Sequence, residues 1–294
     1  MSRVYNFSAG PAVLPECVLQ EAAAEMMDYR GTGMWAKRAW QEAQMFGQAN
    51  AVASSADQNF TYIPDCSDLP ISENADYVYI CENNTIYGTK FHELPNTKGK
   101  DLVSDVSSCF LSEPVDVTKY GMLYGGVQKN IGPAGMAIVI IREDLIRDDI
   151  DPKVPVYLRY DTHADAGSMY NTPNCWAIYV CGKVFRYLLD NGGLEAIDKV
   201  NQDKAAVLYD YLDNSKLFKG TVDKEVRSLM NVPFVTGSKE LDAEVVAYTK
   251  AAGFDNLKGH KSVGGLRASI YNAMPKEGVV ALVECLKKFE TERT

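Results

Sequence analysis

Short apolar segments recur in the first half of the chain, each bounded by Gly, Asn, Asp or Ser. Four of them are rich in β-branched and aromatic residues, which is typical of buried strands. These segments are 77–81, 102–106, 122–124 and 137–141. Before these strands the apolar residues follow a helical period. They recur at helical spacing from Pro15 as far as Gly31, and the pattern of residues 35–46 predicts a second helix.

Longer periodic segments dominate the second half. Their apolar residues repeat every three or four positions, which predicts amphipathic helices, and one further strand is expected before the last of them. The helices are expected at 175–189, 194–212, 242–252 and 279–289, and the strand at 266–270. Strands separated by helices favour an α/β fold, followed by a smaller α+β unit toward the C-terminus.

Composition narrows the classes of function. The 294 residues carry a net charge of −9, and an acidic surface does not attract nucleic acid. No apolar run approaches the roughly 20 residues of a membrane span, and the first residues do not resemble an export signal, so a cytoplasmic protein without membrane contact is expected. Seven scattered cysteines predict reduced thiols, and three histidines at unrelated spacings offer little to a metal ion.

The most unusual stretch is 125–135, where Lys129 lies among four glycines and a proline between two apolar strands. One interpretation is a flexible hairpin with a solvated lysine. The other is a reactive amine in a tight loop, where glycine lets the backbone approach a ligand and burial lowers the lysine pKa. The residues alone leave both interpretations open.

Two other charged residues are candidates for the same chemistry. Asp105 lies at the end of a predicted buried strand. A carboxylate there needs a cationic partner, such as a protonated ring nitrogen. The other interpretation is that Asp105 only caps the next turn. Arg267 follows Gly264-Gly265 in a predicted strand, which suits recognition of a carboxylate or phosphate, or pairing with an acidic residue. Loops typical of P-loop and Rossmann nucleotide sites, and the nucleophile elbow of serine hydrolases, are absent from the sequence.

At these residues the chain resembles the phosphoserine aminotransferase family, with similar stretches in the same order along nearly its whole length. These stretches are 6–12, 83–88, 105–108, 126–135, 170–173 and 264–275. The resemblance implies a fold-type-I enzyme with a three-layer large domain, a smaller α+β domain and pyridoxal 5′-phosphate (PLP) as cofactor. It places the large domain at 16–195 and the small domain at 1–15 plus 196–294. It also implies a homodimer with active sites at the subunit interface.

The reaction implied by the resemblance exchanges an amino group between O-phospho-L-serine and 2-oxoglutarate, in L-serine biosynthesis. Many bacterial members also act on 4-phosphonooxy-L-threonine in pyridoxine synthesis. Lys129 matches the lysine that bonds to the cofactor and then moves the substrate proton. Asp105 matches the carboxylate that keeps the pyridine nitrogen protonated.

The remaining matches concern binding of cofactor and substrate. Trp35 matches the aromatic residue stacked on the cofactor ring, and Thr85 a contact near its phenolic oxygen. Gln128 matches a phosphate contact. Asn171 and Thr172 match residues that reach the cofactor phosphate of the neighbouring subunit. On the substrate side, Arg267 matches the arginine that binds the substrate α-carboxylate. Lys261 occupies a position where many members have arginine; lysine keeps the positive charge but lacks the planar guanidinium group.

One departure from the family is large. Members have a further segment between the residues that correspond to Met34 and Trp35, with a strand, a helix and the glycine-rich turn that forms the cup for the cofactor phosphate. A helix N-terminus is a natural anion site, and this chain lacks that one. We therefore keep as an alternative a catalytically impaired or inactive relative that acts only by association. A lyase or desulfurase of the same fold type is a weaker alternative, because no cysteine lies in a recognisable nucleophile loop.

Overall fold

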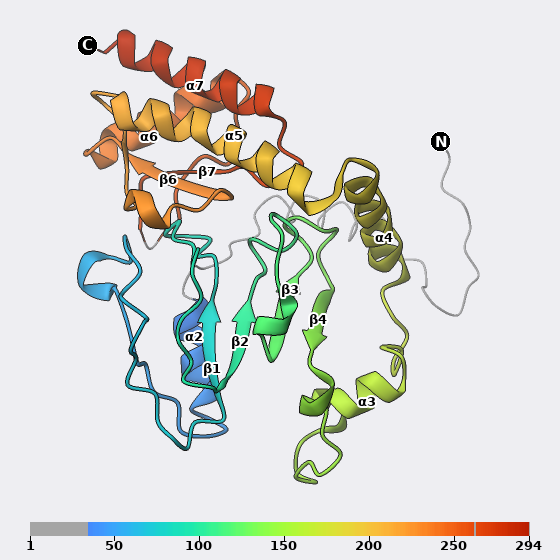
Figure 1. Ribbon diagram of the computed structural model, residues 1–294. Coiled ribbons are helices and arrows are strands. Elements are labelled where there is room, and N and C mark those ends of the chain that lie inside the picture. Colours follow the sequence, from blue (N-terminus) through green and yellow to red (C-terminus); the bar gives the residue numbers. More distant parts are fainter. Residues whose placement is uncertain (1–34, 262, 294) are drawn as a thin grey trace, which may run out of the picture. The chain divides into compact units, whose positions relative to one another are not determined.

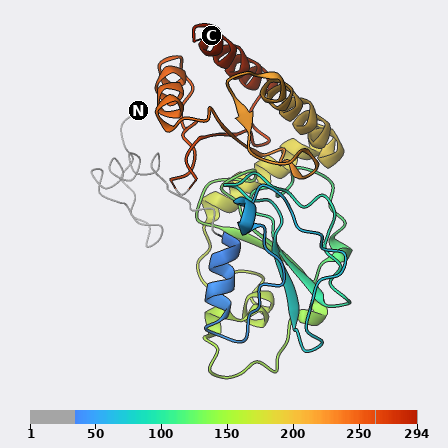
Figure 2. The same cartoon turned by 90° about the vertical axis from the view of Figure 1, so that its left-hand side faces the viewer.

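The computed structural model describes residues 35–261 and 263–293 (Figure 1). The helix predicted after Pro15, and Met34 at the predicted junction, lie outside the described residues. The first described element is helix α2 (Trp35–Ala43), which begins where predicted and is followed by turn residues. It contacts strand β1, and Figure 2 shows it beside the strands.

The first sheet has four strands, all at the predicted positions to within two residues. They are β1 (Tyr77–Cys81), β2 (Asp101–Asp105), β3 (Met122–Gly126) and β4 (Ala137–Ile141), in that order across the sheet. The first three run parallel and β4 is antiparallel to β3. Alternate side chains of β1, β2 and β3 are buried, and Val78, Ile80, Leu102 and Leu123 pack in one apolar cluster. The period of two in the sequence therefore corresponds to one buried face.

Helices connect this sheet to the C-terminal part of the chain. They are α3 (Tyr160–Asp165), α4 (Cys175–Asp190) and α5 (Gly193–Asn214). The side chain of Asn174 caps α4 by accepting a hydrogen bond from the Ala177 N–H. Between α4 and α5 the backbone turns at Gly192, whose φ of 93° favours glycine.

The second sheet has three antiparallel strands, β5 (Lys219–Gly220), β6 (Asn231–Val235) and β7 (Leu266–Ser269). Helices α5, α6 (Lys239–Ala251) and α7 (Lys276–Thr291) share one apolar core with β6 and β7 (Figure 1). Strands β5 and β6 were not predicted, whereas β7, α6 and α7 lie where the sequence placed them. Five 3₁₀ helices complete the described elements, at Ala56–Gln58, Val117–Lys119, Glu143–Leu145, Val156–Leu158 and Lys224–Val226.

A mixed sheet with helices, followed by a smaller α+β unit, is the layer pattern that the sequence predicted. The residue boundaries given for two domains stay a prediction. Among the helices of the described ranges, none combines the length and apolarity needed to cross a bilayer. The same ranges contain no group of three or more His, Cys, Asp or Glu residues that could hold a metal ion.

Candidate active site

Three of the predicted site residues follow the carboxyl ends of parallel strands. Thr85 comes four residues after β1, Asp105 is the last residue of β2, and Lys129 comes three residues after β3. Parallel neighbours end at the same edge of a sheet, and open α/β sheets bind ligands outside that edge. The topology of β1, β2 and β3 therefore brings a hydroxyl, a carboxylate and an amine together.

The amine of Lys129 is half-buried, and its Nζ donates a hydrogen bond to Thr85 Oγ1 at 3.0 Å. Burial lowers the pKa of Lys129, the positive charge of Arg267 lowers it further, and the negative charge of Asp105 opposes both. An amine with a lowered pKa is more often unprotonated, and so more nucleophilic, at neutral pH. The structure thus favours the reactive amine over the solvated loop lysine.

Asp105 is half-buried, and its Oδ1 accepts a hydrogen bond from the Ser107 N–H at 2.9 Å. Its charge acts on neighbouring acids. Burial and the nearby Asp105 carboxylate together raise the pKa of Cys81 and that of Tyr124 each to about 12. Both neighbours are therefore neutral at physiological pH, and Asp105 supplies negative charge at this edge of the sheet.

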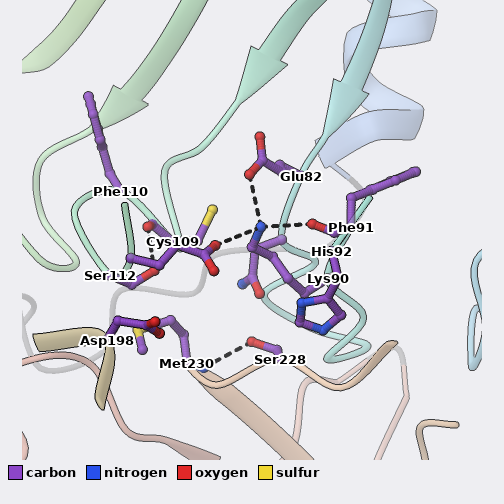
Figure 3. A network of polar contacts seen from close by, with 12 residues as sticks. Glu82, Lys90, Phe91, His92, Cys109, Phe110, Ser112, Asp198, Ser228 and Met230 are labelled. Atoms are coloured by element: carbon purple, nitrogen blue, oxygen red, sulfur yellow. Dashed lines mark hydrogen bonds and ion pairs between the residues drawn. The ribbon is translucent and has the colours of Figure 1, made fainter. Parts of the chain in front are cut away.

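Thr85 belongs to the loop 82–91, whose two ends are joined by two backbone hydrogen bonds. The Phe91 N–H donates to the Glu82 carbonyl and the Asn84 N–H to the Thr89 carbonyl. Lys90 fixes the base of this loop from inside, because its buried Nζ bonds Glu82 at 2.8 Å and Glu113 at 2.9 Å (Figure 3). A buried ammonium ion with two carboxylates holds a fixed geometry, since removing either partner would leave charge unpaired.

Arg267 reaches this loop from the second sheet. Its Nη1 donates to the Thr85 carbonyl at 3.1 Å, so Lys129 and Arg267 both bind the same residue. Burial lowers the pKa of Arg267. Its Nε is buried and has no hydrogen-bond partner among the residues that the structure describes. A buried donor without a partner costs free energy, so this edge of the guanidinium is suited to bind a hydrogen-bond acceptor.

The other predicted site residues lie apart from this group or at the surface. Trp35 is half-buried at the start of α2, with the Arg38 guanidinium 5.6 Å from its ring centre, and within the described ranges no hydrogen bond or ring contact links it to Lys129. The exposed residues are Gln128, Asn171, Thr172 and Lys261. The structure therefore brings together Thr85, Asp105, Lys129 and Arg267, and leaves the predicted phosphate contacts facing solvent.

Two residues next to this group were given no role from the sequence. Asn130 directly follows Lys129, and its Oδ1 accepts a hydrogen bond from the Asn272 N–H at 3.0 Å. Both asparagines fall within the stretches that carry the family resemblance. Their proximity, across 142 positions of the chain, is a property of the fold that spacing could not indicate.

The chain is similar to known proteins both in sequence and in structure. The sequence model of the family described as aminotransferase class-V matches residues 26–282. A phosphoserine aminotransferase of Bacillus cereus is 40% identical over 99% of both chains. One of Desulfotalea psychrophila is 46% identical over 91% of this chain and 73% of its own.

Solved structures agree with the sequences. Phosphoserine aminotransferase from Bacillus circulans subsp. alkalophilus superposes with a TM-score of 0.86 at 35% identity, over 99% of both chains. A PLP-bound phosphoserine aminotransferase from Trichomonas vaginalis gives a TM-score of 0.82 at 32% identity, over 97% of this chain and all of the other. The fold is therefore that of the fold-type-I PLP enzymes.

The lengths of the alignments bear on the missing segment. The alignment with the Bacillus cereus protein spans 359 positions, 65 more than the 294 residues of this chain. The Desulfotalea psychrophila alignment spans 267 positions and covers 91% of this chain but only 73% of that relative. The longer alignment is consistent with a segment missing from this chain relative to the Bacillus cereus protein.

The residues present fit the ring end of a PLP molecule. A half-buried amine of lowered pKa is available to its aldehyde, a half-buried carboxylate to its ring nitrogen, and the hydroxyl of Thr85 to its phenolic oxygen. The Nε of Arg267, whose Nη1 binds the Thr85 carbonyl, is a buried donor without a partner among the described residues. The family match covers these residues together with their sheet. The chain belongs to the class-V aminotransferase family and is a pyridoxal 5′-phosphate-dependent transaminase.

Proposed function

We propose that this transaminase exchanges an amino group between O-phospho-L-serine and 2-oxoglutarate, or in reverse between L-glutamate and 3-phosphohydroxypyruvate. The relatives named phosphoserine aminotransferase, matched over 99% of the chain, support this substrate pair. In this proposal the reaction belongs to L-serine biosynthesis and takes place in the cytoplasm. A second substrate, 4-phosphonooxy-L-threonine of pyridoxine synthesis, has the same phosphate and amino-acid ends and belongs to the same proposal.

Each residue of the site has one task in this proposal. The bound cofactor supplies a ring that withdraws electrons from the substrate Cα. Lys129 binds the cofactor through its amine and, once released, moves the proton between the substrate Cα and C4′ of the cofactor, for which its lowered pKa suits it. Asp105 keeps the ring nitrogen protonated through its negative charge. Thr85 orients the Lys129 amine by the 3.0 Å hydrogen bond.

Arg267 binds the substrate α-carboxylate, and one observation carries this part of the proposal. Its Nη1 is engaged by the Thr85 carbonyl, while its buried Nε has no partner among the described residues. A carboxylate oxygen on Nε would satisfy that donor, in the charge-assisted geometry that arginine favours. Because Thr85 also binds Lys129, the carboxylate would be held beside the amine that acts on the neighbouring Cα.

A homodimer completes the phosphate end of the site in this proposal. Asn171 and Thr172 are exposed and precede α4, so they are free to reach the cofactor phosphate of a second copy. Gln128 contacts that phosphate from its own subunit, and Trp35 stacks on the cofactor ring and lines the substrate side. Lys261 binds the substrate phosphate as a point charge.

The purified 294-residue chain tests the proposal when PLP is added. We expect a visible absorbance band that the Lys129→Ala variant lacks, and glutamate-dependent turnover of 3-phosphohydroxypyruvate. Arg267→Lys should raise KM for that substrate by about tenfold or more, because lysine has no Nε donor to the carboxylate and lacks the planar guanidinium. An intact chain that shows no band with PLP refutes the assignment of the site.

The missing segment favours a second candidate, an impaired or inactive relative that only associates with other chains. The relatives align over 65 positions more than this chain has, and the residues assigned to the phosphate are exposed. In that case the chain shows the absorbance band only at high PLP concentration and no turnover. Sustained turnover by the chain alone rules this candidate out.

A further inference from the structure

Three consecutive backbone carbonyls, of residues 110–112, each accept a hydrogen bond from a different asparagine amide. Asn130 Nδ2 donates to the Phe110 carbonyl at 2.9 Å, Asn272 Nδ2 to the Leu111 carbonyl at 2.8 Å, and Asn201 Nδ2 to the Ser112 carbonyl at 2.9 Å. The three donors come from the loop after β3, the segment after β7 and helix α5. We call Asn130, Asn201 and Asn272 the asparagine clamp.

The members of the asparagine clamp also bind one another. Asn130 Oδ1 accepts from the Asn272 N–H at 3.0 Å, and Asn272 Oδ1 accepts from Asn201 Nδ2 at 2.9 Å. Asn201 is fully buried and the other two are half-buried. Hydrogen bonds in such a network depend on one another, so the loss of one amide disturbs the geometry of the others.

The segment held by the clamp is in a conformation that needs support. Leu111 has a φ of 55°, in the left-handed region that costs a branched residue free energy. Its side chain packs on Val127 and Ile131, which flank Lys129 in the chain. The clamp therefore fixes segment 110–112, against which the loop of Lys129 packs.

Two members of the clamp are also close in sequence to a group of the site. Asn130 follows Lys129 directly, and Asn272 lies five residues after Arg267. The segment after Arg267 is tied to α5 a second time, because the buried Lys204 Nζ donates to the Tyr271 and Met274 carbonyls at 2.8 and 3.2 Å. Displacement of Asn130 or Asn272 would thus change the positions of the Lys129 amine and the Arg267 guanidinium relative to Thr85.

We propose that the asparagine clamp is a positioning device that sets the place of the Lys129 amine relative to Arg267 and Asp105. Its three members are positioning residues, because they hold the backbone of 110–112, against which the loop of Lys129 packs, and tie it to the segment after β7. Loss of the clamp lets the loop of Lys129 move outward, and a better solvated amine regains the ordinary lysine pKa. The inference rests on the proposed role of Lys129 but concerns a property that exists without the cofactor.

The test measures the pKa of Lys129 in the cofactor-free protein, by competitive acetylation with acetic anhydride across a pH series and mass spectrometry of the Lys129 peptide. Asn272→Ala and Asn201→Ala each remove clamp hydrogen bonds. Thr249→Val is the matched control, because it removes a buried hydrogen bond to the Val245 carbonyl in α6, away from the clamp. We expect both asparagine variants to raise the pKa toward the ordinary value of about 10.4, and the control to leave it unchanged.

Asn201→Ala keeps the test decisive if Asn272→Ala does not fold, because Asn201 lies on α5 and binds the Ser112 carbonyl and the Asn272 side chain, not the backbone at Lys129 or in β7. A Lys129 pKa equal to that of the parent in a folded clamp variant, with a loss of thermal stability like that of the control, overturns the proposal. The result is distinguishable from failure of the proposed function, since acetylation needs neither PLP nor turnover. With PLP, the same variants should lower kcat by about 10- to 100-fold.

Discussion

The reactivity of the Lys129 amine depends first on its burial and then on two nearby groups of opposite charge, Asp105 and Arg267. Asp105 favours the protonated amine, whereas burial and Arg267 favour the neutral one. The net result is a lowered pKa, so the neutral form is reached at a lower pH than for an exposed lysine. Neutralising either partner should therefore shift the pKa, and in opposite directions.

Asp105→Asn should lower the pKa of Lys129 further, and Arg267→Met should raise it. Each effect is expected to be about one pH unit, as for a charge a few ångströms away. The pH dependence of Lys129 acetylation in the cofactor-free protein measures both. Lys258→Met removes an exposed cation of the same region and is the control. Shifts of the same sign in both variants would mean that loss of structure, and not charge, controls the amine.

At the scale of elements, the sequence predicted the parallel strands and the loops that follow them, because short apolar runs and glycine are local signals. It could not predict that Arg267 meets the Thr85 carbonyl, since the two lie 182 positions apart and the contact depends on packing of β7. Strand β6 was missed as well. It contains Pro233 and is buried on both faces, so it shows no period-two alternation.

Helix α5 carries a buried cation that makes stability depend on pH. Lys204 is fully buried, and burial lowers its pKa to about 8. Between that value and the ordinary lysine value, the unfolded chain binds more protons than the folded one, so stability rises with pH across this window. Below about pH 8 the folded protein holds a charged, buried ammonium ion, and above it that cost is relieved.

Lys204→Met should remove this pH dependence. The parent is expected to gain about 1–3 kcal/mol relative to the variant between pH 7.5 and 10, because one pKa unit corresponds to about 1.4 kcal/mol. Urea unfolding at several pH values measures the difference. Lys199→Met, at an exposed position of the same helix, should give a difference that does not change with pH. A constant difference for Lys204→Met would show that its amine is not buried in solution.

For the whole molecule, the proposed homodimer makes each site depend on both subunits. A mixture of the Lys129→Ala variant with the Asn171→Ala/Thr172→Ala double variant, after unfolding and refolding together, should regain about a quarter of the parent activity. Half of the dimers are then mixed, and each mixed dimer has one intact site. Turnover of 3-phosphohydroxypyruvate measures this, and activity no higher than the average of the separate variants would contradict shared sites.

The four-stranded sheet ends on both sides in strands that lack an outer neighbour within the described residues. On β4 the hydrogen bonds from Val127 N–H to Met136 and from Arg142 N–H to Gly121 set the alternation, so Val139 directs its backbone groups away from β3. Val139 and Ile140 are also about 40% exposed. An apolar strand with a free edge is a template for pairing with another chain.

Val139→Lys should therefore reduce aggregation of the chain, because a charge on an edge strand opposes strand pairing. Light scattering at 37 °C should grow several times more slowly than for the parent. The substitution moves the net charge of −9 closer to zero, which by itself would promote aggregation, so a gain in solubility comes from the edge. Val280→Lys, at an equally exposed position of α7, is the matched control and should bring no gain. Equal gains in both variants would show that a lost apolar side chain, and not the open edge of β4, governs association.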